Sequence, residues 1–239
     1  MKIDEQFGHH RSMTAIQHMA KMAAAMASPA RLKMLEFLAD GVARSATDLA
    51  ILADVQANTA TTHLQVLLKV DLIRVKKQGR YRFFQIRDEV VGDMLEVLGE
   101  QATYLTHQQL PPPHTDIAFA RSCYDHVAGW LGVNITRSLI ENHYLEEQTK
   151  GHYCLTTTGE TFFNDLGIDL NKVKNSRRQF ARACCDWTEN KNHLGGALGA
   201  ALMSRLSDKQ WISKNADYRE IFITAKGKQG LADCLGLSL

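Results

Sequence analysis

Apolar residues in the first seventy positions recur with the period of a helix, and the patterns end at residues that typically stop helices. The segment Met13 to Ala27 contains no Gly or Pro and predicts a first helix. Ser28 and Pro29 predict the N-cap and the first position of a second helix that ends near Gly41. Two more helices are predicted at "DLAILA" and "TATTHLQVLLKV", where leucines return at helical spacing.

The period then changes from that of a helix to that of a strand. The segments "LIRVKK" and "RYRFFQI" alternate β-branched or aromatic residues with polar ones, and "QG" separates them. This pattern predicts a β-hairpin with Gly79 at its tip. A long helix is predicted from Glu89 to Thr106, and three prolines in "PPPH" follow it. We therefore predict an N-terminal domain at 1–109, a Pro-rich linker at 110–116 and a C-terminal domain at 117–239.

The C-terminal domain contains two segments of similar sequence. When its halves are aligned, Leu131 matches Leu198, Gly132 matches Gly199 and Leu139 matches Leu206, and further matches continue to the end of the chain. The repeats run from about 121–170 and 182–239, and each predicts a helix, a hairpin and a second helix, similar to a degenerate winged helix. One copy alone would leave an apolar face uncovered, so we expect the two copies to pack about a pseudo-twofold axis. The predicted fold class is α+β and mostly helical.

Composition and charge narrow the function. Hydrophobic residues make up 45% of the 239 positions, no run of eighteen apolar residues occurs, and the N-terminus lacks the apolar core of a secretory signal. We therefore predict a cytoplasmic protein with no membrane partner. The net charge is only +2, but the segment 57–87 carries seven Lys or Arg against one Asp. Such a local excess is typical of a nucleic-acid-binding surface.

The order of helices followed by a basic hairpin is that of a winged helix-turn-helix. The stretches "ASPARLKMLEFLADG", "SATDLA" and "VQANTATTHLQVLLKVDLIRVKKQGRYRFFQI" resemble the ArsR/SmtB family of bacterial transcriptional regulators. The resemblance covers roughly the first hundred residues. It implies a repressor that binds operator DNA, and modules of this kind bind two half-sites as a symmetric dimer.

Short polar side chains on the last of the four helices and basic side chains on the hairpin are the candidate DNA contacts. Gln and Asn can pair with adenine, Thr can touch a thymine methyl, and Lys or Arg can bind phosphates. The candidate residues are Gln56, Asn58, Thr59, Thr61, Thr62, His63, Gln65, Lys76, Lys77 and Arg80. His63 could instead pack between helices, with one ring nitrogen hydrogen-bonded.

The helices Met13 to Ala27 and Glu89 to Thr106 are the candidate homodimer surfaces, because nothing else in the small winged domain covers their apolar stripes. The alternative is that they pack on the C-terminal domain.

The metal ligands that the resemblance implies are missing from the N-terminal domain. The helix at "SATDLA" lacks the Cys-x-Cys pair of some members, and Asp93 and His107 lack the partners that others use. His9 and His10 form a pair that we expect to be only solvated.

Cysteine and histidine recur instead in the repeats, in "RSCYDHVAG" and in "RACCDW" followed by "HLGG". Convergence of the two copies would bring together two kinds of ligand for zinc or another thiophilic metal. Alternatively, Arg121 and Arg182 could activate a redox-sensing thiol, or the cysteines could simply pack as small apolar residues. The candidate metal ligands are Cys123, His126, Cys184, Cys185 and His193, and the cofactor itself stays open.

The sequence contains neither a catalytic nucleophile motif nor a dinucleotide-binding motif, so it does not favour an enzyme. We predict a sequence-specific DNA-binding transcriptional regulator, a repressor, whose C-terminal domain responds to a metal or a thiol-directed effector. The alternative is a C-terminal domain that is purely structural or that binds a partner or small molecule. Candidate pocket residues for that alternative are Trp130, Tyr144, Phe162, Trp187 and Trp211.

Overall fold

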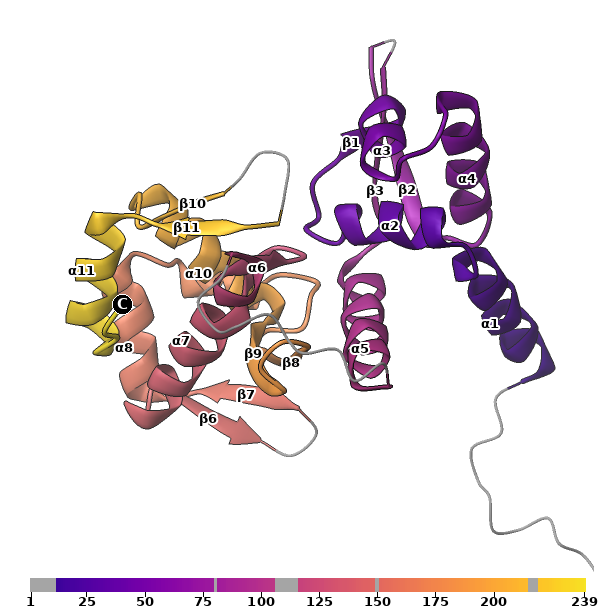
Figure 1. Cartoon of the computed structure of the whole chain (residues 1–239). Coiled ribbons are helices and arrows are strands. Elements are labelled where there is room, and N and C mark those ends of the chain that lie inside the picture. The colour runs from indigo at the N-terminus through magenta and orange to yellow at the C-terminus, as the bar shows by residue number, and fades with distance from the viewer. Residues whose placement is uncertain (1–11, 80, 106–115, 149–150, 215–218) are drawn as a thin grey trace, which may run out of the picture. The chain divides into compact units, whose positions relative to one another are not determined.

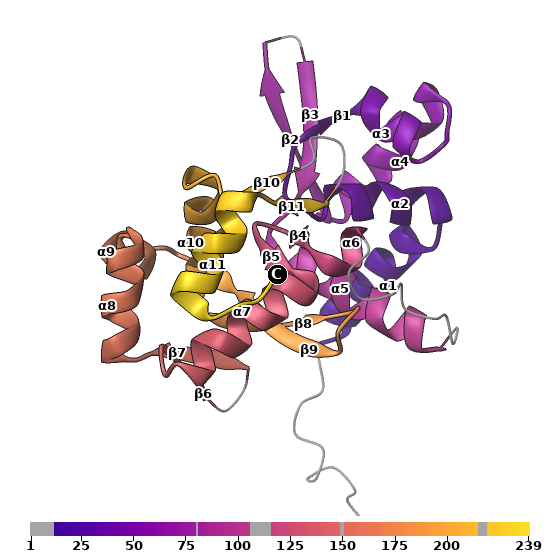
Figure 2. The same ribbon diagram turned by 60° about the vertical axis from the view of Figure 1, so that its left-hand side comes forward.

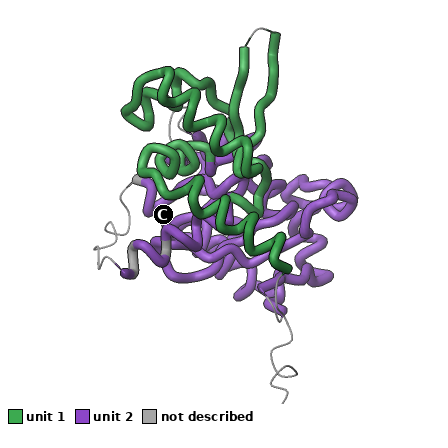
Figure 3. The backbone as a smooth tube through the Cα atoms, turned by 90° about the vertical axis from the view of Figure 1, so that its right-hand side faces the viewer, with its two compact units in different colours: residues 1–38, 42–91 green, residues 39–41, 92–239 purple. Residues whose placement is uncertain are grey.

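The computed structural model describes residues 12–79, 81–105, 116–148, 151–214 and 219–239. It divides into two compact units, coloured separately in Figure 3. Unit 1 comprises residues 1–38 and 42–91, and unit 2 comprises residues 39–41 and 92–239. Most of the predicted linker at 110–116 lies outside the described residues, so the placement of the domain boundary there stays a prediction.

Unit 1 is a winged helix-turn-helix, as the sequence predicts. Ser45 caps a short helix with a capping box, in which Ser45 and Asp48 satisfy each other's backbone amides. Ile86 on the hairpin and five helix leucines are almost completely buried and form the core, namely Leu35, Leu38, Leu49, Leu64 and Leu67. The elements are α1 (Met13–Met26), α2 (Pro29–Leu38), β1 (Arg44–Ser45), α3 (Ala46–Leu52), α4 (Ala57–Lys69), β2 (Ile73–Gln78) and β3 (Tyr81–Ile86) (Figure 1).

The strands of unit 1 form a three-stranded antiparallel sheet in the order β1-β3-β2. Strands β2 and β3 make the hairpin, which is the wing, with Ile73 opposite Ile86 and Gln78 opposite Tyr81. Gly79 lies in the turn with a φ of +60°, a backbone conformation that favours glycine.

Helix α5 (Glu89–Leu105) begins in unit 1, and its residues from Gly92 onward belong to unit 2. Unit 2 then repeats the order hairpin, helix, hairpin, helix, and we call each of these two segments a pass. The first pass is β4 (Arg121–Cys123), β5 (His126–Ala128), α7 (Gly129–Glu141), β6 (Leu145–Gln148), β7 (His152–Leu155) and α8 (Thr157–Leu166). The second is β8 (Arg182–Asp186), β9 (Lys191–Gly195), α10 (Gly196–Asp208), β10 (Ile212–Lys214), β11 (Ile221–Ile223) and α11 (Ala225–Leu235). Short helices α6 (Asp116–Phe119) and α9 (Leu170–Lys174) precede the two passes.

The sequence predicted the helix, hairpin and helix of each pass but missed the hairpin that opens it. Strands β4 and β5 are joined by only two residues, and each strand is three residues long. Alternation over so short a stretch gives no usable period, so the sequence pattern predicts no strands at β4 and β5. Strands β8 and β9 are five residues each, but their sequences, RACCD and KNHLG, do not alternate apolar with polar residues.

The two passes exchange partners. Strand β8 of the second pass pairs with β7 of the first through His152 and Arg182, which makes a four-stranded sheet in the order β6-β7-β8-β9. In the reciprocal position, Arg121 on β4 bridges to Glu220 beside β11. The helices cross in the same way, because α7 packs on β9 and α10 packs on β5, while α11 lies beside α7 (Figure 2). Each half of unit 2 therefore completes the other.

The exchange places leucines, isoleucines and aromatic residues of both passes in one core. Leu131 and Leu139 on α7 are fully buried, as are Leu198 and Leu206 at the matching positions of α10. These are the residues that the sequence alignment had paired. Two cysteines of the opening hairpins lie outside this core, in a small separate cluster in which Cys123, Ala128 and Cys184 pack together.

Candidate nucleic-acid interface and candidate metal centre

Helix α4 presents a polar face and buries an apolar one. Its buried residues are Ala60, Leu64 and Leu67, which face the core of unit 1. The predicted contact residues Gln56, Asn58, Thr59, Thr61, Thr62 and Gln65 are all exposed. Gln56 is the N-cap of the helix without a side-chain cap hydrogen bond. This face offers the amide and hydroxyl groups that base edges in a major groove can bind.

His63 differs from the other predicted contacts because it is only half exposed. Its Nδ1 lies 3.4 Å from Nη1 of Arg31, a residue of α2. Burial and the charge of Arg31 together lower the pKa of His63 below its ordinary value. A neutral ring hydrogen-bonded to a neighbouring helix favours the packing interpretation of His63 over a phosphate contact.

The wing carries the basic residues that were predicted to contact the DNA backbone. Lys76 and Lys77 on β2 are exposed, as is Arg74, whose Nη2 donates a hydrogen bond to Gln85. Arg80 lies outside the described residues. Exposed lysines on a hairpin next to a polar recognition helix are the arrangement that a winged helix uses on DNA.

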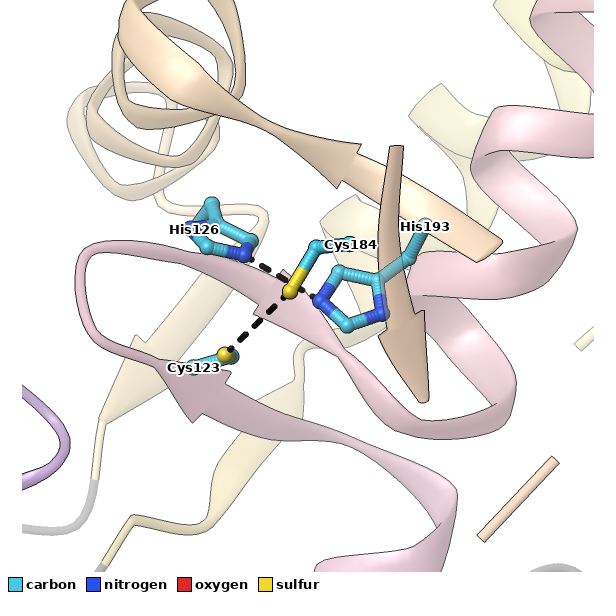
Figure 4. A group of neighbouring side chains, drawn as sticks. All are labelled: Cys123, His126, Cys184 and His193. Carbon is cyan, nitrogen blue, oxygen red and sulfur yellow. Dashed lines mark hydrogen bonds between the residues drawn. The ribbon is translucent and has the colours of Figure 1, made fainter. Parts of the chain in front are cut away.

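Four of the five predicted metal ligands meet inside unit 2 (Figure 4). Cys123 on β4 is the cross-strand partner of His126 on β5, and Cys184 on β8 is the partner of His193 on β9. The longer spacing between Cys184 and His193 therefore only lengthens the second hairpin and leaves the pairing unchanged. Cys185 is the next residue along β8 and is not a member of the group.

The four side chains converge from two separate hairpins. The Sγ atoms of Cys123 and Cys184 are 3.8 Å apart, and the Nε2 atoms of His126 and His193 are 3.1 Å apart. One ligand atom from each residue lies within 4.8 Å of all the others, and all four residues are buried. We refer to Cys123, His126, Cys184 and His193 as the Cys/His cluster.

Carboxylates lie behind both histidine rings. Oδ2 of Asp186 is 3.3 Å from Nδ1 of His193, and Oδ1 of Asp125 is 3.7 Å from Nδ1 of His126. Although burial opposes its ionisation, the hydrogen bond from His193 and the charge of Arg121 hold the pKa of Asp186 far below its usual range. Asp186 is therefore a buried carboxylate ion next to a ring nitrogen. In each copy the sequence suggests an ion pair between the Asp and the Arg of the same copy, but the structure pairs Asp186 with Arg121 of the other copy.

The chemical environment of the thiols is not that of a reactive thiolate. A hydrogen bond with Cys184 and complete burial raise the pKa of Cys123 to about 12. Cys184 is also buried. Reactive thiols are partly exposed and have a lowered pKa, so these two residues do not match the thiol-sensor alternative.

A buried ionic network connects the cluster to helix α5. Asp186 pairs with Nη2 of Arg121 at 3.0 Å, and the same nitrogen lies 3.6 Å from Oε2 of Glu96 on α5. Glu96 also pairs with Arg219. Asp93, one turn earlier on α5, pairs with Arg182, and its Oδ1 is 3.8 Å from Sγ of Cys184.

The aromatic residues of the alternative pocket lie in separate contacts. Tyr144 stacks on Phe162 with ring centroids 4.2 Å apart, and Trp130 stacks on Phe119. Trp187 lies against the guanidinium of Arg121, and Trp211 is buried in the core. Of the five, Trp130 alone lines one of the described surface pockets, next to Asn134 and Arg137.

Fold and interface together define a winged-helix DNA-binding protein, and comparison with known proteins agrees. Residues 26–76 match a family model described as a helix-turn-helix domain. The uncharacterized HTH-type transcriptional regulator YdfF of Bacillus subtilis (strain 168) is 38% identical over 213 residues, which cover 88% of this chain and 94% of YdfF. The chain therefore belongs to the HTH-type transcriptional regulators. This confirms the prediction of a DNA-binding regulator made from the sequence.

Several solved structures are similar to smaller parts of the chain. The homodimeric winged helix-turn-helix domain of Mb0332 from Mycobacterium bovis is 24% identical, covers 43% of this chain and 97% of its own, and gives a TM-score of 0.38. The antimony-specific transcriptional repressor AntR is 22% identical, covers 45% of this chain and 97% of its own, and gives a TM-score of 0.38. In the part of the chain that the structure describes, every helix is too short or too polar to cross a bilayer.

Proposed function

We propose that this regulator is a sequence-specific repressor that binds operator DNA as a homodimer through α4 and the wing. The observation that carries the proposal is the exposed polar face of α4 followed directly by the basic strand β2. Gln56, Asn58 and the threonines supply groups that distinguish bases, while Lys76, Lys77 and Arg80 supply charge to phosphates.

Exposed apolar side chains on the predicted dimer helices support the homodimer. On α1, Met13 is 69% exposed, and Ile16 and Met19 are each 46% exposed. On α5, Leu105 is 71% exposed. Helical faces of this kind are suited to packing against a second copy of the chain, and a dimer doubles the number of base pairs that are contacted.

We further propose that unit 2 is a duplicated domain that receives the effector. Its two passes through the same elements, with matching leucines in one core, support duplication. The Cys/His cluster is the part of unit 2 where side chains that can ligate a metal meet, so it is the natural effector position. Burial of both cysteines favours a metal over a thiol-directed effector. For the small-molecule or partner alternative, Trp130 is the one candidate aromatic residue that lines one of the described surface pockets.

Operator binding by point variants tests the DNA part of the proposal. Duplexes are first selected from random sequence with the full wild-type chain, and affinities are then measured at several salt concentrations. Lys77→Ala should weaken binding to all duplexes, because a phosphate contact carries no sequence information, whereas Gln56→Ala should relax the sequence preference.

Lys228→Ala is the matched control, since Lys228 is an exposed lysine on α11, far along the chain from the wing. It should leave affinity and preference unchanged. Equal behaviour of Lys77→Ala and Lys228→Ala, together with an unchanged preference in Gln56→Ala, would refute this placement of the interface.

A further inference from the structure

We propose that Cys123, His126, Cys184 and His193 bind one Zn²⁺ ion in a closed tetrahedral site that joins the two repeats of unit 2. The regulatory consequence rests on the proposed function, in which unit 2 receives the effector. The site itself is a property of the DNA-free protein and can be tested without DNA.

The distances between ligand atoms match those of a tetrahedral zinc site. Zinc lies about 2.3 Å from sulfur and about 2.0–2.1 Å from nitrogen, so the edges of a tetrahedron are roughly 3.8 Å between two sulfurs and roughly 3.3 Å between two nitrogens. The cluster has 3.8 Å between its sulfurs and 3.1 Å between its nitrogens. The sulfur–sulfur and nitrogen–nitrogen edges therefore match. The sulfur–nitrogen separations, which are all within 4.8 Å, must come to roughly 3.6 Å for one ion to hold all four atoms.

The outer contacts of the two histidines provide a second argument. A carboxylate lies behind each Nδ1, at 3.3 Å in His193 and at 3.7 Å in His126. Histidines that bind a metal commonly hold their second ring nitrogen against a carboxylate, which leaves Nε2 for the metal. The two Nε2 atoms face each other across 3.1 Å in a buried space, so one ion could contact both.

Charge balance supports the same ligand. Binding replaces the two thiol protons, which are released to solvent. Two thiolates, two neutral imidazoles and one Zn²⁺ then sum to zero, so the loaded cluster adds no net charge to the interior. Asp186 and Asp125 then act as the outer partners that orient histidine ligands in many zinc sites. Four protein ligands leave no coordination position for a substrate, as in zinc sites that hold structure together.

The position of the site explains how metal binding could affect other elements of the molecule. Each repeat contributes one Cys and one His from its opening hairpin, so the ion ties the two hairpins together. Asp93 of α5 contacts Cys184 directly. Glu96 of α5 reaches His193 through a chain of ion pairs that runs from Arg121 to Asp186. Zinc should therefore order α5, the helix that begins in unit 1, and so connect metal load to DNA binding.

The metal content of the full-length chain tests the proposal. The protein is purified under reducing conditions, and the metal is quantified by mass spectrometry. It is then removed and replaced by Co²⁺, whose absorption reports coordination number and thiolate ligation. We expect one zinc per chain and a four-coordinate cobalt spectrum with thiolate charge-transfer bands.

The variants Cys184→Ser and His193→Ala should lose stoichiometric zinc. Cys185→Ser is the matched control, because it changes the adjacent cysteine on the same strand, and it should keep one zinc. Cobalt substitution of the wild-type chain decides the question even if the ligand variants do not fold.

Three results would overturn the site. They are no metal uptake by the reduced wild-type chain, a cobalt spectrum without thiolate bands, and equal loss of zinc in Cys185→Ser and Cys184→Ser. If Cys123 and Cys184 form a disulfide in air and the reduced protein still binds no metal, that result also counts as no metal uptake and overturns the site. If the protein binds one zinc but Gln56→Ala and Lys77→Ala bind operator DNA as wild type does, only the proposed function is refuted.

Discussion

Replacing Gly199 with alanine should destabilise unit 2, whereas the same replacement at Gly99 should stabilise it slightly. A Cβ at Gly199 on α10 would lie closer than 3.0 Å to the carbonyl oxygen of Leu194, a separation that real Cβ atoms essentially never show. It would also lie 3.0 Å from the Leu194 carbonyl carbon and 3.1 Å from Cβ of His126. The neighbours are mostly backbone, so the added methyl cannot be accommodated by rotating one side chain.

The magnitude follows from two opposing terms. Forcing an extra methyl into a packed site costs about 1–3 kcal/mol, and backbone neighbours place Gly199 at the upper end, about 3 kcal/mol. Alanine in a helix gains about 1 kcal/mol over glycine. The net loss is about 2 kcal/mol, which for a unit of this size corresponds to a fall in Tm of roughly 4–8 °C. At Gly99 on α5 nothing lies within 4 Å of the added Cβ, so only the gain remains.

Tryptophan fluorescence during thermal or urea unfolding of the full chain provides the assay. The protein has three tryptophans, and Trp130, Trp187 and Trp211 all belong to unit 2, so the signal reports on this unit alone. Because the crowded Cβ would also push on His126, Gly199→Ala should bind zinc more weakly than wild type. A Gly199→Ala variant as stable as Gly99→Ala would refute the close packing of α10 on the opening hairpins.

Three further predictions concern the metal and the DNA. Removing zinc with a chelator should lower the free energy of unfolding of unit 2 by about 4 kcal/mol, relative to a sample that contains free zinc at about a thousand times its Kd. The unfolding transition followed by tryptophan fluorescence measures this, and an unchanged midpoint would contradict it. Asp186→Asn should weaken zinc binding about 10–100-fold in a competition titration, because His193 loses the carboxylate that orients it; retention of wild-type affinity would argue against this role. Lys77→Ala should reduce the slope of log K against log salt by about 0.9 in operator titrations, as expected for one lost phosphate contact; a slope equal to that of wild type would show that Lys77 makes none.

The winged helix could be predicted from the sequence almost completely because its elements are local. Each helix of unit 1 carries its own apolar period and its own start or stop residue, such as Ser45 or Gly41. The wing has alternation over six residues in each strand, and Gly79 lies in its turn. Patterns of this length determine an element without knowledge of its neighbours.

Unit 2 could be predicted only in part because its defining contacts are not local. The matched leucines indicate that the two halves are alike, but they do not show that β8 pairs with β7 or that α7 packs on β9. Partner exchange depends on which copy covers which apolar face, and residues far apart in the sequence decide this. The contacts of Asp186 could not be predicted for the same reason, since its partners Arg121 and Gly129 lie more than fifty residues earlier in the chain.

The Cys/His cluster shows how a weak sequence pattern can correspond to a well-defined geometry. The spacing of Cys and His differs between the copies, so spacing alone is a weak signal of a shared site. In an antiparallel hairpin, however, residues added at the turn leave the cross-strand pairs above it unchanged. Cys123 therefore faces His126 across a two-residue turn, and Cys184 faces His193 across a longer one, in the same register. The same register also excludes Cys185, because neighbouring residues on a strand point to opposite faces. Pairing across strands, and not spacing along the chain, thus determines which cysteines can share one ion.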